Sequence, residues 1–331
     1  MINWEIKKIF KSKSGIITLI LFFMLSISMI FIKPQLEGVI DYEDKNKVVG
    51  NVEEQFNMKI ELLKEFSGNE EKDQVSKELK EISNKKLEAI RFNEYKDIRF
   101  WRTFTHRAFH PLMAFIMLII TVIIFSNIYT DEIISTVDKL ILSSKNKNKA
   151  LYSKLALSIG IPVILYGVYL AIQFIITYIQ YGKPINGRLQ VIRIIDNPLL
   201  IKGAYTIHEF TLMKICIIIV IFVTLGVLAS LFSFITTSSI QSTSGFLVFI
   251  FLGKAMTLIK WLPKEVLIIL SKANYVDLIF NFNEFAGMYS GRLKIFTMSL
   301  DVSNLCLGII IVTLFIGILS CMTIFKKILT R

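Results

Sequence analysis

Two histidines, His106 and His110, lie four residues apart in the segment FWRTFTHRAFHP. On a helix this spacing would place both imidazoles on one face, where they could bind a metal ion. The segment supplies neither a third ligand nor the glutamate of a metalloprotease motif. Its aromatic and basic residues are typical of the headgroup region beside a membrane span. A headgroup contact is therefore the favoured interpretation, and metal binding is the alternative.

The remaining candidates for catalysis are incomplete. His208 and Glu209 form an isolated pair without a nucleophile. The segment GKPINGRL carries Arg188 where a nucleotide-binding P-loop requires lysine. We therefore expect no enzymatic activity and no cofactor in this chain. The cysteines all fall in apolar runs, which disfavours a disulfide framework or a thiolate metal cluster: Cys216, Cys306 and Cys321.

Two lysines lie inside apolar runs. Lys254 lies near the middle of the run 245–262, where an isolated cationic side chain costs about 2.5–3.5 kcal/mol on insertion scales. We expect it to face the bundle interior, water or an anionic partner. Two interpretations stay open, a contact to cargo or a lipid headgroup in a translocation path, and snorkelling toward the membrane surface. Lys214 lies near a span end and is expected to snorkel.

The segments that carry these residues are apolar enough to span a membrane. Hydrophobic residues make up 53% of the 331 residues, and the mean hydropathy is +0.59. A span needs about 20 apolar residues and must be helical, because lipid offers the backbone no hydrogen-bond partners. The first run lacks a signal-peptide cleavage site and is expected to be retained. Six runs are candidates: 15–32, 112–128, 155–179, 210–235, 245–262 and 305–325.

Both chain ends are expected in the cytoplasm. With this orientation, 12 basic residues lie inside and 9 in the two shorter outer loops, a bias in the expected direction. The long outer loop 33–110 carries 15 basic and 16 acidic residues. Apolar residues recur at helical spacing in 47–66 and in 74–100, so the loop is expected to form a helical hairpin that packs on itself or on a partner.

The segment 129–154 predicts a short amphipathic helix at the membrane surface. Asp131 and Glu132 would occupy its first turn, where acids suit the helix dipole. Ser143–Ser144 would end it, and a lysine run would return the chain to the inner leaflet. A plain lysine-rich inner loop with an interfacial helix is the alternative. The apolar face would consist of Ile133, Val137, Leu140 and Ile141.

This segment resembles the coupling helix of the permease subunits of type-2 ABC exporters, which docks on the ATP-hydrolysing subunit. The N-terminal segment NWEIKKIFKSKSG is similar to the family's amphipathic connecting helix, with Trp4, Ile6 and Phe10 as its apolar residues. The segment WLPKEVLIILSKANYVDLIFNF resembles the family's re-entrant helices. Residues that the resemblance assigns to ATPase coupling are Glu132, Ile133, Ser135, Thr136, Val137, Leu140, Leu142, Lys149 and Lys154.

The resemblance implies an all-α membrane protein with three parts. Residues 1–32 would hold an amphipathic helix and the first span, 33–110 an extracellular helical hairpin, and 111–331 spans two to six. The coupling helix would cover about 130–143, and re-entrant helices would separate spans five and six.

The resemblance also implies partners and a location. An ABC ATPase, in two copies and with its own ATP and Mg²⁺, would supply the energy. A second permease subunit, identical or related, and membrane lipid are the other expected partners, and no nucleic acid is expected. The chain would lie in the bacterial cytoplasmic membrane and export an amphipathic peptide, antimicrobial or lipid.

A non-transporting receptor or scaffold, whose hairpin binds a partner, is the alternative from another class. It would need no ATPase and would tolerate changes within 129–154. An ion-coupled transporter is disfavoured because the predicted spans contain no Asp or Glu apart from their boundaries.

Overall fold

The computed structural model describes residues 2–34, 52–68, 74–90, 97–259, 261–295 and 298–329. Within these residues, six helical stretches are long and apolar enough to cross a membrane. The chain is therefore a multi-pass membrane protein with a helical membrane domain, as the apolar runs predict. The stretches are α2 (Lys13–Phe31), α9 (Lys147–Tyr181), α10 (Ile207–Ile235), α11 (Ser239–Met256), α15 (Val302–Leu329) and Arg99–Ile134, which comprises α5 (Arg99–Ala108), α6 (Pro111–Phe125) and α7 (Thr130–Ile134).

The second span is preceded by a helix that the sequence did not indicate. The chain breaks at His110, whose side chain accepts a hydrogen bond from the backbone N–H of Leu112, and Pro111 occupies the first turn of α6. Proline suits this position because its missing N–H would have no intrahelical partner. The aromatic segment that contains His106 thus forms the helix α5, which ends before His110.

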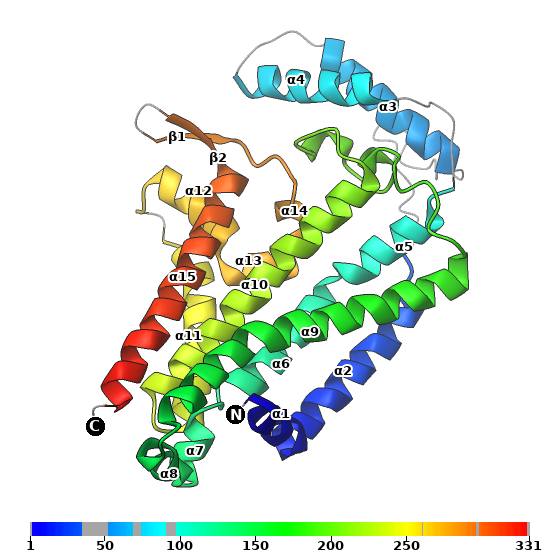
Figure 1. Ribbon diagram of the computed structural model, residues 1–331. Coiled ribbons are helices and arrows are strands. Elements are labelled where there is room, and N and C mark those ends of the chain that lie inside the picture. Colours follow the sequence, from blue (N-terminus) through cyan, green and yellow to red (C-terminus); the bar gives the residue numbers. More distant parts are fainter. Residues whose placement is uncertain are drawn as a thin grey trace.

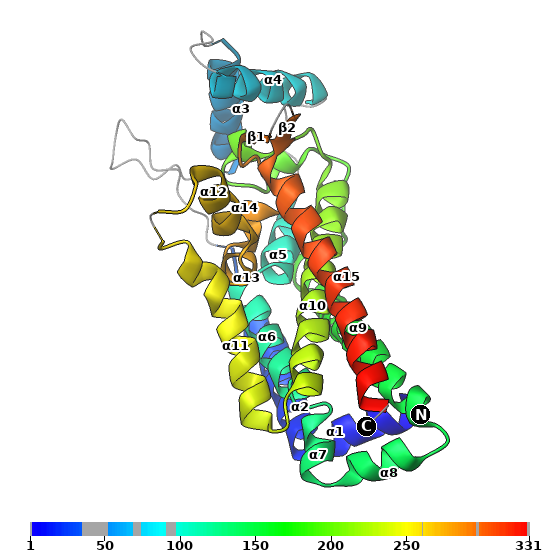
Figure 2. The ribbon, with the colours of Figure 1, turned by 90° about the vertical axis from the view of Figure 1, so that its left-hand side faces the viewer.

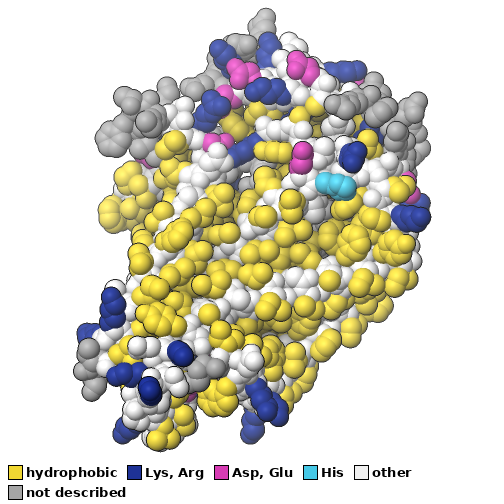
Figure 3. Space-filling view, viewed as in Figure 1, with side chains coloured by type: hydrophobic (Ala, Val, Ile, Leu, Met, Phe, Trp, Pro, Cys, Tyr) yellow, Lys and Arg dark blue, Asp and Glu magenta, His cyan; other side chains and the backbone are white. Residues whose placement is uncertain are grey.

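Helix α10 lies at the centre of the bundle and packs against α6, α9, α11 and α15 (Figure 1). Close approach to α9 depends on Gly226, where an added Cβ would lie 2.5 Å from the backbone oxygen of Ser158. Small residues permit such contacts between helices in membranes. On the face shown in Figure 3, apolar side chains form a broad band between two ends that carry charged side chains.

The buried guanidinium of Arg107 holds the end of α2 against α5 and α9. Its nitrogens donate to the carbonyl oxygens of Ile30 (2.7 Å) and Ile32 (3.2 Å) and to the side chains of Thr177 (3.2 Å) and Gln180 (2.8 Å). Carbonyls at a helix C-terminus have no intrahelical donor, so this arginine satisfies them. The contact fixes the first span in the bundle.

The two ends of the chain lie at the same end of the bundle. Helix α1 (Ile2–Lys11), the C-terminal end of α15, α7 and the short helix α8 (Val137–Ser143) lie together there in both views (Figure 1, Figure 2). The opposite end carries α3 (Val52–Gly68), α4 (Gln74–Ala89), the 3₁₀ turns η1 (Val191–Arg193) and η2 (Pro198–Leu200), and a β-hairpin.

The second helix of the predicted outer hairpin is shorter than its sequence pattern. Helices α3 and α4 pack together, and α4 ends at Ala89, so 74–100 is not one helix. Positions 47–51 and 91–96 lie outside the described residues. The apolar side of α3 packs on the chain's own outer loops, while Val75 of α4 is 52% exposed. The cluster contains Phe56, Ile60, Leu63, Val191, Ile192, Ile201, Phe210 and Met288.

Between α11 and α15 the chain forms three short helices and a two-stranded antiparallel sheet. The helices are α12 (Lys264–Ala273), α13 (Tyr275–Phe280) and α14 (Phe282–Phe285). Strands β1 (Arg292–Ile295) and β2 (Met298–Asp301) pair with Leu293 opposite Leu300. The segment that resembles re-entrant helices thus forms short helices, and its entry into the membrane stays a prediction; the small sheet was not predicted.

Candidate functional site

Four charged side chains from three helices meet at the end of the bundle that holds both termini. The ammonium of Lys154 on α9 lies 2.6 Å from Oε1 of Glu132 on α7 and 3.0 Å from Oε1 of Glu5 on α1. It also donates to the backbone oxygen of Ile128 at 3.3 Å. Lys8 on α1 reaches the same Glu132 oxygen at 2.6 Å. We call these four side chains the α1–α7–α9 ion network.

This network is buried and balanced in charge. Lys154, Glu132 and Glu5 are 0%, 1% and 2% exposed, and only Lys8 reaches solvent, with 34% of its side chain exposed. Two carboxylates face two ammonium groups, so no net charge is buried when all four groups are ionised. Removal of one partner of a buried ion pair costs about 3–5 kcal/mol, because the other charge is left without compensation. The network therefore fixes α1, α7 and α9 relative to one another.

Hydroxyl groups of neighbouring helices complete the anchoring of α7. Ser233, near the end of α10, accepts hydrogen bonds from the backbone N–H groups of Tyr129 (2.9 Å) and Thr130 (3.2 Å). N–H groups at the start of a helix lack intrahelical acceptors, so this serine acts as an external cap. On the other side, Ser239 of α11 donates to Asp131 at 3.3 Å. Helix α7 is thus bonded to α1, α9, α10 and α11.

The predicted single amphipathic helix is wrong in one respect, because the chain breaks into α7 and α8 at Ser135–Thr136. Thr136 has a φ of 58°, in the left-handed region, which is costly for a β-branched residue. The Ser135 hydroxyl donates to the backbone oxygens of Asp131 (2.7 Å) and Glu132 (3.2 Å). Such local hydrogen bonds favour helix ends. The predicted apolar face is therefore divided between two helices.

Helix α8 projects from the bundle and presents apolar side chains at the surface. None of its residues, all of which the structure describes, is buried. Leu140 is 70% exposed, and Ile134 at the end of α7 is 61% exposed. Lysines surround these residues, including Lys139, Lys145 and Lys149, all exposed. Helices α7 and α8 thus present exposed apolar side chains close in sequence to exposed lysines. A surface of this kind can bind another macromolecule or the membrane surface.

The structure brings together some of the residues that the family resemblance selected and separates others. Glu132 and Lys154 meet in the ion network, whereas Lys149 is exposed. Ile133 packs against the core. Val137 and Leu142 are half-buried, and Ser135, Thr136 and Leu140 are exposed.

Sequence reasoning missed Glu5 and the role of Lys8. The N-terminal segment was interpreted through Trp4, Ile6 and Phe10, of which Ile6 packs on the core, Phe10 is half-buried and Trp4 is 51% exposed. A signal was present, since Glu5 is the single acid among the basic residues of 1–13. A lone acid on a cationic helix at a membrane surface indicates a specific partner.

A close turn brings α1 back onto the first span. The Ser12 hydroxyl accepts a hydrogen bond from the N–H of Gly15 at 3.0 Å and caps α2. An added Cβ at Gly15 would lie 1.9 Å from the backbone oxygen of Ile9, so only glycine fits between the two helices here. This turn directs Glu5 and Lys8 toward α7 and α9.

Lys254 has an anionic partner, as its position in an apolar run leads us to expect, whereas Lys214 is not placed as expected. Helix α11 begins at Ser239, so Lys254 lies in its last turn rather than at mid-span, with 48% of its side chain exposed. It pairs with Asp277 of α13 at 2.8 Å. Lys214 does not snorkel, because it is only 6% exposed.

His106 of α5 and His110, which caps the start of α6, lie beside each other, with ring centroids 5.3 Å apart. Among the described residues, no group of three or more His, Cys, Asp and Glu side chains is arranged to hold a metal ion. His208 contacts Trp101 instead, with ring centroids 4.6 Å apart.

Comparisons with protein-family models, curated proteins and solved structures found no match for this chain.

Proposed function

We propose that this chain is the membrane-spanning permease subunit of a type-2 ABC exporter. A separate ATPase supplies the energy, and an amphipathic peptide, antimicrobial or lipid is the cargo. The observation that carries the proposal is the α1–α7–α9 ion network, which joins the surface helices α1 and α7 to the membrane-spanning helix α9 through buried charges.

The network supports transmission of force. An ATPase that pushes on α7 and α8 would move Glu132, and Lys154 would carry that movement into the long helix α9. Ser233 provides a parallel connection to α10. Because removing one buried partner costs several kcal/mol, α7 moves with the bundle rather than independently. Coupling further requires that the ATPase bind two permease conformations with different affinities.

The exposed side of the helix pair supports docking of a partner. Leu140 and Ile134 are apolar and more than half exposed, next to exposed Lys139. A helix with apolar anchors fits into a groove on a partner protein. The basic residues near both chain ends and near α8 favour a cytoplasmic location for this end, where an ATPase has access to ATP.

The receptor alternative has less support from the outer hairpin. Phe56, Ile60 and Leu63 on the apolar side of α3 are buried against the chain's own outer loops. The chain itself thus covers these side chains, whereas Leu140 at the opposite end of the bundle is exposed to solvent. A receptor would need a binding surface on other parts of α3 and α4.

Purification of the chain from its native membranes, followed by a measurement of co-purified ATP hydrolysis, tests the proposal. The substitution Leu140→Asp should lower this hydrolysis at least tenfold, because a carboxylate would be buried in the docking groove. Ile185→Asp is the matched control, since Ile185 is 54% exposed at the other end of the bundle. Equal hydrolysis with wild-type and Leu140→Asp proteins contradicts the assignment.

A further inference from the structure

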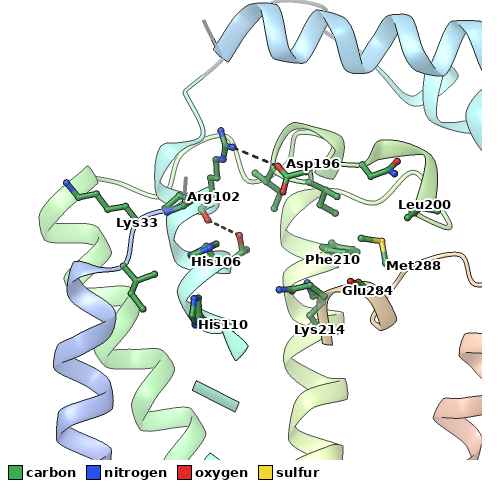
Figure 4. Close-up of a pocket in the computed structure, with 17 residues that line it drawn as sticks. Lys33, Arg102, His106, His110, Asp196, Leu200, Phe210, Lys214, Glu284 and Met288 are labelled. Carbon is green, nitrogen blue, oxygen red and sulfur yellow. Dashed lines mark hydrogen bonds and ion pairs between the residues drawn. The ribbon is translucent and has the colours of Figure 1, made fainter. Parts of the chain in front are cut away.

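A cavity of about 580 Å³ lies at the end of the bundle opposite α7 and α8 (Figure 4). Its walls come from the end of α2, from α5, from α10, from the loop after η1 and from α14. Volumes of about 300–1,000 Å³ are typical of sites that bind small molecules. The functional proposal above makes no use of this cavity.

The cavity contains a buried lysine without a carboxylate partner. Lys214 of α10 lies on its wall and points across it toward His106 and His110 (Figure 4). Among the described residues, no carboxylate lies within 4.0 Å of its ammonium, and the hydrogen-bond acceptor is Oδ1 of Asn283 at 2.5 Å. An ammonium has three donors. Two of them thus remain for a ligand.

Aromatic rings enclose the same ammonium. Its nitrogen lies 4.8 Å from the ring centroid of Phe109, 5.2 Å from that of Phe210 and 5.6 Å from that of Phe282. Cation–π contacts hold the charge in place but contribute only about 0.5–2 kcal/mol. Burial of an unpaired charge costs more than that, so an anion in the cavity would complete the site.

Other polar groups around the cavity can contact an anion, and its acids are exposed. Arg102 and His106 of α5, His110 before α6 and Lys33 after α2 line the same space. The Nδ1 atom of His106 is buried and has no hydrogen-bond partner among the described residues. Two acids also line the cavity, but Asp196 has 68% of its side chain exposed and Glu284 is exposed.

We propose that this cavity binds the phosphate headgroup of a phospholipid from the adjacent leaflet. Lys214 would donate to the phosphate oxygens, and His106 and Arg102 would contact the same group. A lipid is the source because Ile32 and Pro34, at the end of the first span, form part of the wall. The acyl chains can therefore stay in the bilayer beside α2 while the headgroup enters.

Binding of short-chain lipids to the purified protein in a non-ionic detergent tests this site. Dioctanoyl phosphatidylglycerol is the probe, dioctanoylglycerol is the same molecule without phosphate, and inorganic phosphate is the free anion. Titration calorimetry should show that phosphatidylglycerol binds at least tenfold more tightly than either comparator. Lys214→Met should weaken its binding at least tenfold, and Lys183→Met, at an exposed position outside the cavity, should leave it within twofold.

A second variant covers the case in which Lys214→Met does not fold. Arg102→Gln changes a residue at the rim, 3.9 Å from Asp196, and should weaken phosphatidylglycerol binding about threefold because a charged hydrogen bond is lost. Unchanged binding by the folded variants overturns the site. Equal binding of dioctanoylglycerol excludes a headgroup site, and equal binding of inorganic phosphate assigns the cavity to a free anion instead of a lipid. No ATPase takes part in these measurements, so their result is independent of the exporter proposal.

Discussion

The ammonium of Lys154 lies 2.6 Å from Oε1 of Glu132, and both side chains are almost completely buried. One residue belongs to the longest helix of the bundle and the other to a five-residue surface helix. Glu5 and Lys8 extend this pair to the N-terminal helix. A small element at the membrane surface is thus attached to the bundle by charge as well as by packing.

Loss of the central ammonium should destabilise the protein strongly. In the variant Lys154→Met, Glu132 and Glu5 lose their buried partner, and we expect the free energy of unfolding to fall by about 3–5 kcal/mol. Equilibrium unfolding in mixed detergent micelles measures this change. Lys149→Met is the matched control, because Lys149 is an exposed lysine of the same helix, and it should change stability by less than about 0.5 kcal/mol.

The double variant Lys154→Met, Glu132→Met separates charge from packing. It leaves Glu5 and Lys8, which have opposite charges, so its loss of stability should be smaller than the sum of the two single losses by at least about 1 kcal/mol. Additive losses would show that the two side chains act independently and would contradict the ion network.

Thr136 should tolerate glycine but not proline. Its φ of 58° costs a residue with a side chain about 1–2 kcal/mol, while glycine adopts this conformation freely but loses more chain entropy on folding. Thr136→Gly should therefore leave the unfolding free energy unchanged or raise it by up to about 1 kcal/mol. Thr136→Pro fixes φ near −65° and should lower it by about 3 kcal/mol. Thermal unfolding of both variants measures their order of stability. A loss of unfolding free energy above about 1 kcal/mol for Thr136→Gly would contradict the left-handed conformation at this position.

The sequence predicts the membrane segments well because each of them is a run of about 20 apolar residues, which is long enough to cross a bilayer as a helix. It does not predict the break at Thr136, since threonine has no preference for the left-handed region and the break depends on the anchoring of α7. Nor does it predict the burial of Lys214, because hydropathy alone cannot distinguish a lysine that faces lipid from one that faces Phe109 and Phe282.

Half of the ion network was visible in the sequence. Glu132 and Lys154 were selected from the resemblance, but nothing in their spacing of 22 residues indicates that they touch. Glu5 precedes the first span, 149 residues from Lys154 in the sequence, and meets these residues only because the turn at Gly15 folds α1 back. Contacts between distant segments of this kind require the three-dimensional fold.

The attachment of the outer helices should depend on pH through Lys86. Its ammonium donates to the backbone oxygens of Pro198 (2.6 Å) and Leu199 (3.2 Å), and burial lowers its pKa from 10.5 to about 7. When α4 is detached from the loop at Pro198, Lys86 has its ordinary pKa, so attachment of α4 releases a proton between pH 7 and 10.5. The attachment of α4 should therefore strengthen as pH rises through this range and be weakest at or below pH 7.

Hydrogen exchange of the α4 amides between pH 7 and 9.5, corrected for intrinsic rates, measures this dependence. Lys86→Met should remove most of it, and Lys85→Met, at an exposed neighbouring position, should retain it. Lys59 on α3, whose pKa burial lowers to about 8, adds a dependence of the same sign. Protection that is constant over this range in the wild type would contradict the burial of an ionisable lysine at Pro198.

The end of the bundle that carries α8 should face the cytoplasm. In a variant without native cysteines, Lys145→Cys should react with a membrane-impermeant maleimide only after the cells are opened. Lys183→Cys, exposed just beyond the other end of α9, should react in intact cells. Labelling of Lys145→Cys in intact cells would reverse the orientation and remove access to a cytoplasmic ATPase.

A photo-crosslinking amino acid at Leu140 tests the central claim most directly. Leu140 is 70% exposed on α8, and in the proposed complex it lies in the groove of the ATPase. Illumination of native membranes should yield a covalent product that contains this chain and a subunit labelled by 8-azido-ATP, and the same amino acid at Lys183 should yield none. A product with lipid alone, or no ATP-binding partner at Leu140, would contradict the exporter account.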